Sequence, residues 1–221
     1  MAFGTVHSAR YGEAWDALTA LVAAEGSRRE AYATALARPG AAMRDLADAA
    51  HCLCLLHGRH PGVIDFAAER ATDPVVEAWL TEAAAAFADE RAMLVGLVAA
   101  VGPLPSTPGQ AETEGAILGQ RHAMDMIATS DRAGCPIGAT MALVLDWPAI
   151  RGVLETVAER LGRPIPALRL PEARDGATVI AALATSAAFE RAMLFGAQQT
   201  LAQHRALWQL LDARSTARAG N

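Results

Sequence analysis

Two glutamates occupy the same position in two copies of a seven-residue segment. The segment Glu90-Arg-Ala-Met-Leu-Val-Gly96 returns as Glu190-Arg-Ala-Met-Leu-Phe-Gly196, with one conservative difference. Each copy places a carboxylate within the apolar stripe of a long predicted helix. A carboxylate buried in a core is costly unless it is paired, hydrogen-bonded, protonated or bound to a metal. For Glu90, central on its stripe, the alternatives are a functional site, an ion pair with an arginine or a wet gap between helices. Glu190 lies near the edge of its stripe, so the two copies are not expected to be equivalent.

A second set of ionisable side chains lies at helical spacing. Asp48 and His51 fall on adjacent turns of one predicted helix face, where they can share a metal or where Asp48 can orient the imidazole. His122 and Asp125 repeat the spacing in reverse order. The set is a loose version of the carboxylate-bridged bundle site, in which two helices give single glutamates and two give Glu-x-x-His pairs. It departs from that pattern by an Asp for Glu in the first pair and by the inverted second pair.

Iron or manganese is the metal that such a site would hold, because carboxylate and imidazole ligands suit both ions. The candidate ligands are Glu90, His51, Asp48, Glu190 and His204. His204 is close to the centre of its helix's apolar stripe, and roughly 21 Å of helical rise separate it from Glu190. These two residues cannot share one small site, and a hydrogen-bonded core histidine is the alternative interpretation of His204.

The three cysteines predict neither a disulfide framework nor a zinc site. Cys52 and Cys54 project about 200° apart on a helix, so both cannot bind one tetrahedral ion. Cys135 precedes a proline at a predicted helix start, where a reactive thiol and a structural role are the two alternatives. The sequence also lacks the Gly-x-Gly-x-x-Gly, phosphate-loop and Gly-x-Ser-x-Gly motifs, which argues against those nucleotide-binding and hydrolase classes.

The composition favours helices over strands. Of the 221 residues, 52% are hydrophobic but only 5% are aromatic, which suits closely packed, alanine-rich helices. All 19 basic residues are arginine and the formal net charge is −5. Lysine Schiff-base chemistry is therefore excluded, and no nucleic-acid partner is expected. Because residues 1–10 lack a signal-peptide pattern and no apolar stretch is long enough to span a bilayer, we expect a cytoplasmic protein with no membrane partner.

Glycine and proline punctuation divides the chain into predicted helices. These cover residues 8–25, 27–38, 41–57, a short segment after 61, 74–101, 110–129, 135–161 and 177–212. The nearly all-apolar second half of 41–57 predicts that this helix is central. We expect Ser27 and Glu30 to form a capping box. We also expect breaks at Pro148 and near Thr185, and fraying after Asp212.

These elements predict an all-α fold, a bundle of six to eight helices forming one domain over residues 1–221. Three prolines and two glycines in 102–109 predict a loop between two halves, 8–101 and 110–212. Residues 43–59 can be aligned with 147–163 so that their apolar positions coincide, although few of the aligned residues are identical. The halves thus resemble a weak two-fold repeat, with accidental similarity between alanine-rich helices as the alternative.

Three stretches resemble an uncharacterised all-helical family from GC-rich alphaproteobacteria. They are His-Gly-Arg-His-Pro-Gly at 57–62, Gly-Pro-Leu-Pro-Ser-Thr-Pro-Gly-Gln at 102–110 and Ser-Asp-Arg-Ala-Gly-Cys at 130–135. The resemblance covers about residues 46–161 and implies no activity, because the family has none assigned. At the level of fold, the long helices and half-repeat are also similar to ferritin-like or haem-oxygenase-like bundles, although fold alone does not establish function.

Three functions fit these observations. The first is an enzyme of oxidoreductase type, or a ligand-binding bundle, whose central site uses Glu90, His51 and either Glu190 or His204. The second is a non-catalytic interaction or regulatory protein, in which these groups are structural and an apolar helix face joins two copies. The third is a carrier of apolar ligands, which predicts a large dry cavity with carboxylates facing away from it.

Overall fold

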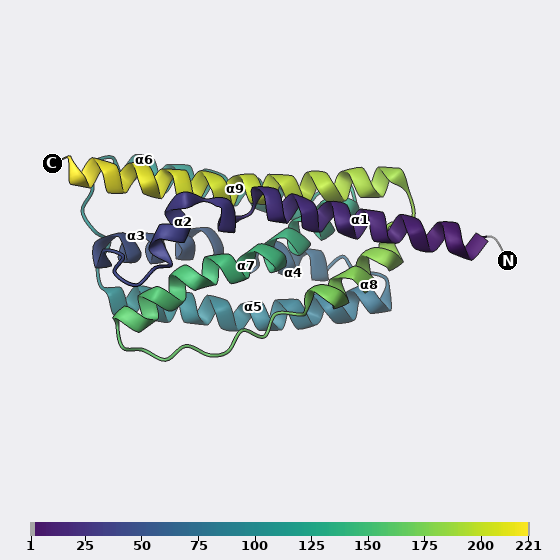
Figure 1. Cartoon of the computed structure of the whole chain (residues 1–221), viewed down its shortest axis with the longest axis horizontal. Helices are drawn as coiled ribbons and strands as arrows, with labels where there is room; N and C mark the ends of the chain where they lie inside the picture. Colours follow the sequence, from purple (N-terminus) through teal and green to yellow (C-terminus); the bar gives the residue numbers. More distant parts are fainter. Residues whose placement is uncertain (1–2, 221) are drawn as a thin grey trace.

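Helices make up all the regular secondary structure of residues 3–220. These are the residues that the computed structural model describes, with side chains described over 12–220. Nine α-helices and one 3-10 helix form an elongated bundle, with α9 along one long side and α5 along the other (Figure 1). The predicted all-α bundle is confirmed, and the described part holds one α-helix more than the upper number expected.

The helix bounds follow the predicted punctuation closely. In chain order they are α1 Phe3–Glu25, η1 Ser27–Arg29, α2 Ala31–Leu36, α3 Met43–His57, α4 Val63–Ala68, α5 Pro74–Val101, α6 Gln110–Ala128, α7 Gly134–Arg160, α8 Ala173–Leu183 and α9 Ala187–Ala219. Asp73 begins α5 by accepting hydrogen bonds from the N–H groups of Val75 and Val76. The predicted break near Thr185 is confirmed, since it separates α8 from α9.

The helices α7 and α9 pack closely and run in the same direction. Gly138 lies against the Met193 backbone, and farther along both helices Asp146 is bonded to His204. Because residues later in α7 contact residues later in α9, the two helices are parallel. A methyl group on Gly138 would overlap the Met193 carbonyl, which explains why this position carries glycine.

The most deeply buried helix is α7, so the prediction that the helix over 41–57 is central is wrong. The predicted break at Pro148 is also wrong, because α7 continues through it. Proline removes one backbone hydrogen bond, and the fully buried side chains of Trp147 and Ile150 hold the helix in place on either side. The expectation that no apolar stretch is long enough to span a bilayer is wrong by length and composition, because among the described helices α7 is long and apolar enough. Most of its apolar stretch is buried by other helices, as is usual for a core helix.

The predicted capping box at Ser27 is wrong. Ser27 begins the 3-10 helix η1, and its hydroxyl donates to Asp146 Oδ2 at 2.6 Å instead of capping a helix with Glu30. In a capping box the serine oxygen would accept from a backbone N–H group, whereas here the hydroxyl donates to a carboxylate 119 residues away, a partner that the local sequence pattern does not reveal.

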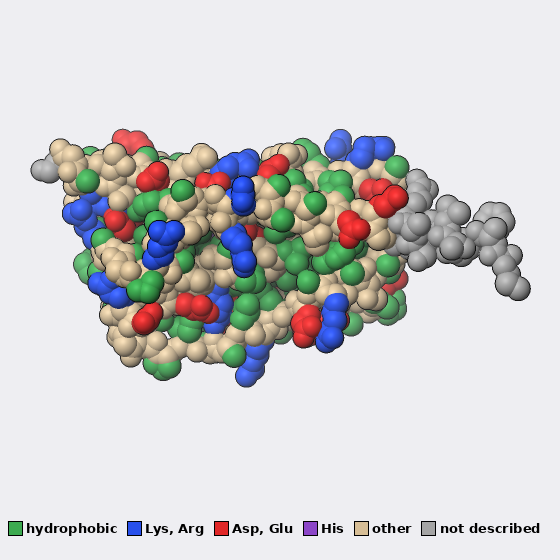
Figure 2. Space-filling view, viewed as in Figure 1, with side chains coloured by type: hydrophobic (Ala, Val, Ile, Leu, Met, Phe, Trp, Pro, Cys, Tyr) green, Lys and Arg blue, Asp and Glu red, His purple; other side chains and the backbone are tan. Residues whose placement is uncertain are grey.

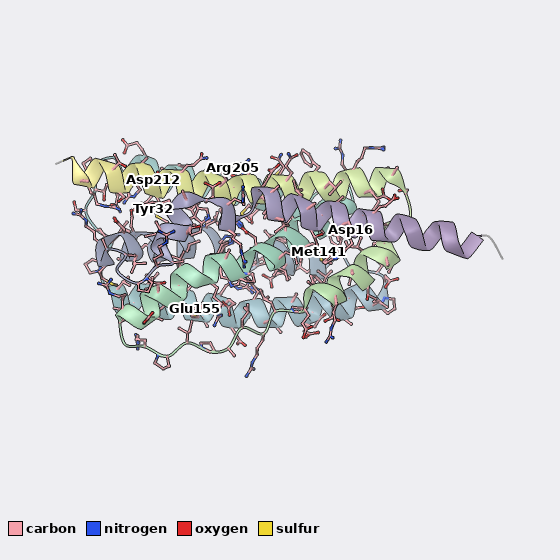
Figure 3. The ribbon with its side chains drawn as sticks, viewed as in Figure 1. Asp16, Tyr32, Met141, Glu155, Arg205 and Asp212 are labelled. Carbon is pink, nitrogen blue, oxygen red and sulfur yellow. The ribbon has the colours of Figure 1, made fainter. Side chains whose placement is uncertain are left out.

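The C-terminal segment is helical rather than frayed. Asp212 points outward from α9 (Figure 3), but Arg214 and Arg218 on the opposite side are buried, at 4% and 7% exposure. Both arginines bond to aspartates of α3. The prediction of a frayed tail is wrong because these long-range ion pairs anchor the last turns.

Helices from both sides of the loop 102–109 pack on one another. α1 contacts α9, and α3 contacts α7 and α9. The loop is therefore a connection across a shared core.

On the face shown in Figure 2, acidic, basic and hydrophobic side chains are interspersed, with no large area of one charge.

Candidate functional site

A pocket of about 440 Å³ lies where α3, the end of α5, the loop 102–109 and α6 meet. This volume falls within the range of small-molecule sites, about 300–1,000 Å³. Its apolar lining residues are Leu55, Val98, Leu104, Ile117 and Leu118. Its polar lining residues are His51, Cys52, Cys54, Gln110, Thr113, Glu114 and Arg214. The pocket thus has apolar walls and a few polar groups, as ligand sites usually do.

The loop 102–109 forms one wall of this pocket. Its two end glycines have left-handed backbone, with φ of +81° at Gly102 and +74° at Gly109, a conformation that glycine adopts without strain. His51 on α3 is bonded to the Gly102 carbonyl at 2.9 Å. Near the other end, Thr107 Oγ1 accepts a hydrogen bond of 3.0 Å from Arg218. These two bonds tie the loop to α3 and α9.

Arg214 reaches the pocket from α9 and is fixed by Asp48. Its Nε and NH2 groups donate to the two carboxylate oxygens of Asp48 at 2.8 Å each. Its NH1 group donates to Thr113 Oγ1 at 2.9 Å. This bidentate geometry is strong and directional. Because Asp48 is fully buried, the pair forms a rigid inner wall.

A second arginine completes a charge-balanced cluster at this end of the molecule. Arg218 NH1 donates to Asp48 Oδ2 and NH2 donates to Asp45 Oδ1, both at 2.6 Å. Ser215 also donates to Asp45 at 3.1 Å. Two arginines therefore face two aspartates. Buried charges are tolerated when each has an opposite partner, which is the case here.

The bond from His51 determines which ring nitrogen can accept a hydrogen bond. A carbonyl oxygen only accepts, so Nε2 must carry the proton that it donates to Gly102. In the neutral ring Nδ1 is then unprotonated and is an acceptor. His51 is half-buried and lines the pocket. A ring that lines the pocket thereby carries one nitrogen that can accept a hydrogen bond.

The surroundings of the two pocket cysteines favour the thiol form. Burial, and secondarily the nearby Asp48 carboxylate, raise the pKa of Cys52 to about 12. Burial also raises the pKa of Cys54. Thiolate is the nucleophilic and metal-binding form of cysteine. Neither residue is therefore suited to nucleophilic catalysis at neutral pH.

Glu90 lies away from the pocket, in a buried ion pair. Its Oε2 accepts from the Trp147 indole N–H at 2.8 Å, and its Oε1 is paired with Arg151. Arg151 also donates from Nε to Glu155, near the end of α7 (Figure 3), at 3.2 Å. Of the alternatives that the sequence left open, the structure shows the arginine ion pair.

Asp146 is the centre of another buried network. It accepts hydrogen bonds from Ser27 N, Ser27 Oγ and His204 Nδ1 at 2.7, 2.6 and 2.7 Å, and Trp208 donates to Ser27 Oγ at 2.9 Å. Burial alone would raise the pKa of Asp146, but His204 and Ser27 together lower it below its usual value. The His57 ring lies edge-on to His204, with centroids 5.1 Å apart. Burial, helped by His204, lowers the pKa of His57 well below 6.5.

The structure gives four of the five predicted ligands different hydrogen-bonding partners. Glu90 bonds to Trp147 and Arg151, and His204 bonds to Asp146. Asp48 bonds to two arginines, and His51 bonds to the Gly102 carbonyl. Glu190 is half-buried in the first turn of α9. Within residues 12–220 no group of three or more His, Cys, Asp or Glu side chains has the arrangement of a metal site. Iron or manganese binding by these residues stays a prediction.

The two copies of the heptapeptide have different environments. Glu90 is 2% exposed, whereas Glu190 is half-buried. Gly196 lies against the Cys135 carbonyl, whereas a methyl group on Gly96 would meet nothing within 4 Å. Identical local sequence therefore serves two different packing roles.

Sequence reasoning missed the arginines and serine that satisfy the buried carboxylates. They are Ser27, Arg91, Arg151, Arg214 and Arg218. Their only signal was position: Arg151 follows Trp147 by one turn, and Arg218 follows Arg214 by one turn. Such spacing places residues on one face but does not identify the partner.

The chain belongs to a family of unknown function (DUF6975), whose model matches residues 22–219. The resemblance to an uncharacterised family is thus confirmed, over a longer part of the chain than expected. Neither a curated protein nor a solved structure matches the chain. The likeness to ferritin-like and haem-oxygenase-like bundles therefore has no support from these comparisons.

Proposed function

We propose that this member of a family of unknown function is a non-catalytic helical bundle that binds a small, largely apolar molecule in the pocket between α3, α5 and α6. The observation that carries the proposal is the pocket itself, about 440 Å³ with apolar side chains from four chain segments. Burying apolar surface supplies the main driving force for such binding, at about 25 cal/mol per Å².

The buried charges support binding rather than catalysis. Glu90 is paired with Arg151, and Asp48 with Arg214 and Arg218. A general base or a metal ligand directs a carboxylate oxygen at its substrate or ion, whereas the oxygens of Glu90 and Asp48 are directed at arginines and at the Trp147 indole. This proposal therefore departs from the metal-dependent oxidoreductase expected from the sequence, and is closest to the apolar-ligand carrier.

The test uses the neutral dye N-phenyl-1-naphthylamine, whose fluorescence rises in apolar surroundings. Val98 is half-buried and lines the pocket, whereas Val95 on the same helix is 55% exposed and outside it. We expect saturable binding that Val98→Trp weakens by about tenfold or more, because the indole occupies the space that the dye needs.

The matched variant Val95→Trp adds the same indole one turn away. It controls for energy transfer from tryptophan and for the general effect of the substitution. We expect its dissociation constant to stay within about twofold of the unaltered protein, because surface substitutions have small effects. A dye signal that does not saturate, or equal dissociation constants for the two variants, would contradict the proposal.

A further inference from the structure

We infer that the ligand of this pocket has an apolar body and a head group that donates a hydrogen bond, such as a hydroxyl or an amine. Carboxylic and phosphoric acids are excluded from this class. The inference rests on the proposed function, because it specifies the ligand of the same pocket. It is carried by the charges and hydrogen-bonding groups that line the wall.

The wall has no positive charge left for an acidic ligand. Arg214 is the only arginine in the pocket lining, and Asp48 neutralises it through two hydrogen bonds. Glu114 adds a negative charge at the exposed edge. An anion placed here would lose its hydration without gaining an unpaired cation, which disfavours binding.

Most of the strong donors in the lining are engaged or buried. Three of the five Arg214 N–H groups donate to Asp48 and Thr113, and the side chain is only 4% exposed, which leaves the other two little access to a ligand. The Thr113 hydroxyl itself donates to the Gly109 carbonyl at 2.9 Å. The Gln110 amide donates to Glu114 at 2.9 Å. The cysteine thiols that remain are weak donors.

The groups left over are mainly acceptors. His51 offers Nδ1, because its Nε2 donates to the Gly102 carbonyl. Glu114 offers its carboxylate, and Gln110 offers its amide oxygen. A ligand that donates a hydrogen bond therefore finds several partners in this pocket, whereas for a ligand that only accepts the lining leaves the second N–H of the Gln110 amide and the weak thiol donors.

Three probes with one aromatic body separate these possibilities: 1-naphthol donates, 1-methoxynaphthalene only accepts, and 1-naphthoate is an anion. Their dissociation constants are measured by isothermal titration calorimetry on the unaltered protein. We expect 1-naphthol to bind about 2- to 10-fold more tightly than 1-methoxynaphthalene, the factor of one neutral hydrogen bond. We expect 1-naphthoate to bind more weakly than both.

Two histidine variants locate the acceptor. His51→Phe should abolish the advantage of 1-naphthol, because the acceptor is lost. It also removes the bond to the Gly102 carbonyl, so 1-methoxynaphthalene, which we expect to stay within about twofold, reports any loosening of the loop. His122→Phe, on the exposed face of α6, should preserve the advantage. His51→Gln keeps a donor for the Gly102 carbonyl and supplies an amide oxygen as acceptor, so it should preserve part of the advantage of 1-naphthol.

The outcomes distinguish this inference from the proposed function. If none of the three probes binds, the proposed function fails. If all three bind with equal affinity, or if 1-naphthoate binds most tightly, the pocket is a ligand site and the inference about the head group is wrong. Persistence of the 1-naphthol advantage in His51→Phe would exclude His51 as the acceptor and overturn the assignment.

Discussion

Asp48 and Arg214 are joined by two parallel hydrogen bonds of 2.8 Å, although 166 residues separate them in the chain. The pair connects the start of α3 to the end of α9 and forms the inner wall of the pocket. It also removes the charge of the one arginine in the lining, so it determines which ligands the pocket can accept. The same pairing of a buried carboxylate with an arginine of another helix recurs between Glu90 and Arg151 and between Asp65 of α4 and Arg91 of α5, where NH1 lies 3.0 Å from Oδ2.

The two repeated glutamates should differ sharply in their effect on stability. Glu90→Ala leaves the guanidinium of Arg151 buried, at 3% exposure, with only the half-exposed Glu155 as a carboxylate partner. We expect the free energy of unfolding to fall by about 3–5 kcal/mol, the usual cost of breaking a buried ion pair. Urea unfolding followed by circular dichroism measures the change.

The matched control is Glu190→Ala, in the second copy of the same segment. Glu190 lies in the first turn of α9, where a carboxylate interacts favourably with the helix dipole. We therefore expect a loss of less than about 1 kcal/mol. Equal losses for the two variants would contradict the different roles assigned to the two copies.

The two glycines that end the repeated segments give a second matched pair. A methyl group on Gly196 would overlap the Cys135 carbonyl of α7, so Gly196→Ala should destabilise the protein by about 1–3 kcal/mol through overpacking. Gly96 has open space around it, so Gly96→Ala should stabilise by up to about 1 kcal/mol through helix propensity. Thermal unfolding of both variants should show midpoints that move in opposite directions; a shared direction would argue against the close approach of α7 and α9.

Stability should decline as the pH falls below about 6.5. The folded-state pKa of His57 is well below 6.5 because the ring is buried and lies near His204. Below 6.5 the unfolded chain binds a proton that the folded chain does not, so the free energy of unfolding falls by up to about 1.4 kcal/mol per pH unit. Asp146 should cause a further loss of stability at lower pH. Its folded-state pKa lies below the usual 3.8, so the stabilisation that its carboxylate provides is lost as the pH falls through this folded-state pKa.

Urea unfolding at several values between about pH 7 and 5 tests the contribution of His57. In His57→Phe, an aromatic ring remains against Phe87 and Trp147 but cannot be protonated. We expect the slope of stability against pH to be reduced in this variant. An unchanged slope would show that His57 is not the group responsible.

The thiols should react at very different rates. At pH 8 a thiol with a pKa of about 12 is thiolate in only about one molecule in ten thousand. Cys52 should therefore resist iodoacetamide in the folded protein, whereas Cys54, which is half-buried at the pocket, should react first. Peptide mass spectrometry follows each residue, and 1-naphthol should slow alkylation of Cys54. Modification of Cys52 as fast as Cys54 would contradict the buried environment.

Sequence patterns predicted the helices well where local chemistry determines the outcome. Asp73 and Pro74 mark the start of α5, and Gly102 marks its end, because capping, proline geometry and left-handed backbone are local properties. The apolar stripe on α5 was also correct, including the burial of Glu90. Errors arose at Ser27 and Pro148, where packing against residues far along the chain outweighed the local preference.

The candidate pocket could not be predicted from the sequence. It combines His51, Val98, Ile117 and Arg214, which lie on four different helices. Helical periodicity predicts which side of a helix is buried, but it does not identify the helix that covers that side. The polar composition after Asp212 predicted fraying, and only the distant aspartates of α3 explain why this segment is ordered.

The most direct test of the pocket uses the isoleucine methyl groups. Ile117 lines the proposed pocket, whereas Ile137 lines a separate pocket of about 400 Å³ beside the start of α7. In a methyl-labelled sample titrated with 1-naphthol, we predict a saturable chemical-shift change at the Ile117 δ1 methyl and none at Ile137. Shifts at Ile137 alone, or no shift at Ile117 when the calorimetric titration is saturated, would contradict binding in this pocket.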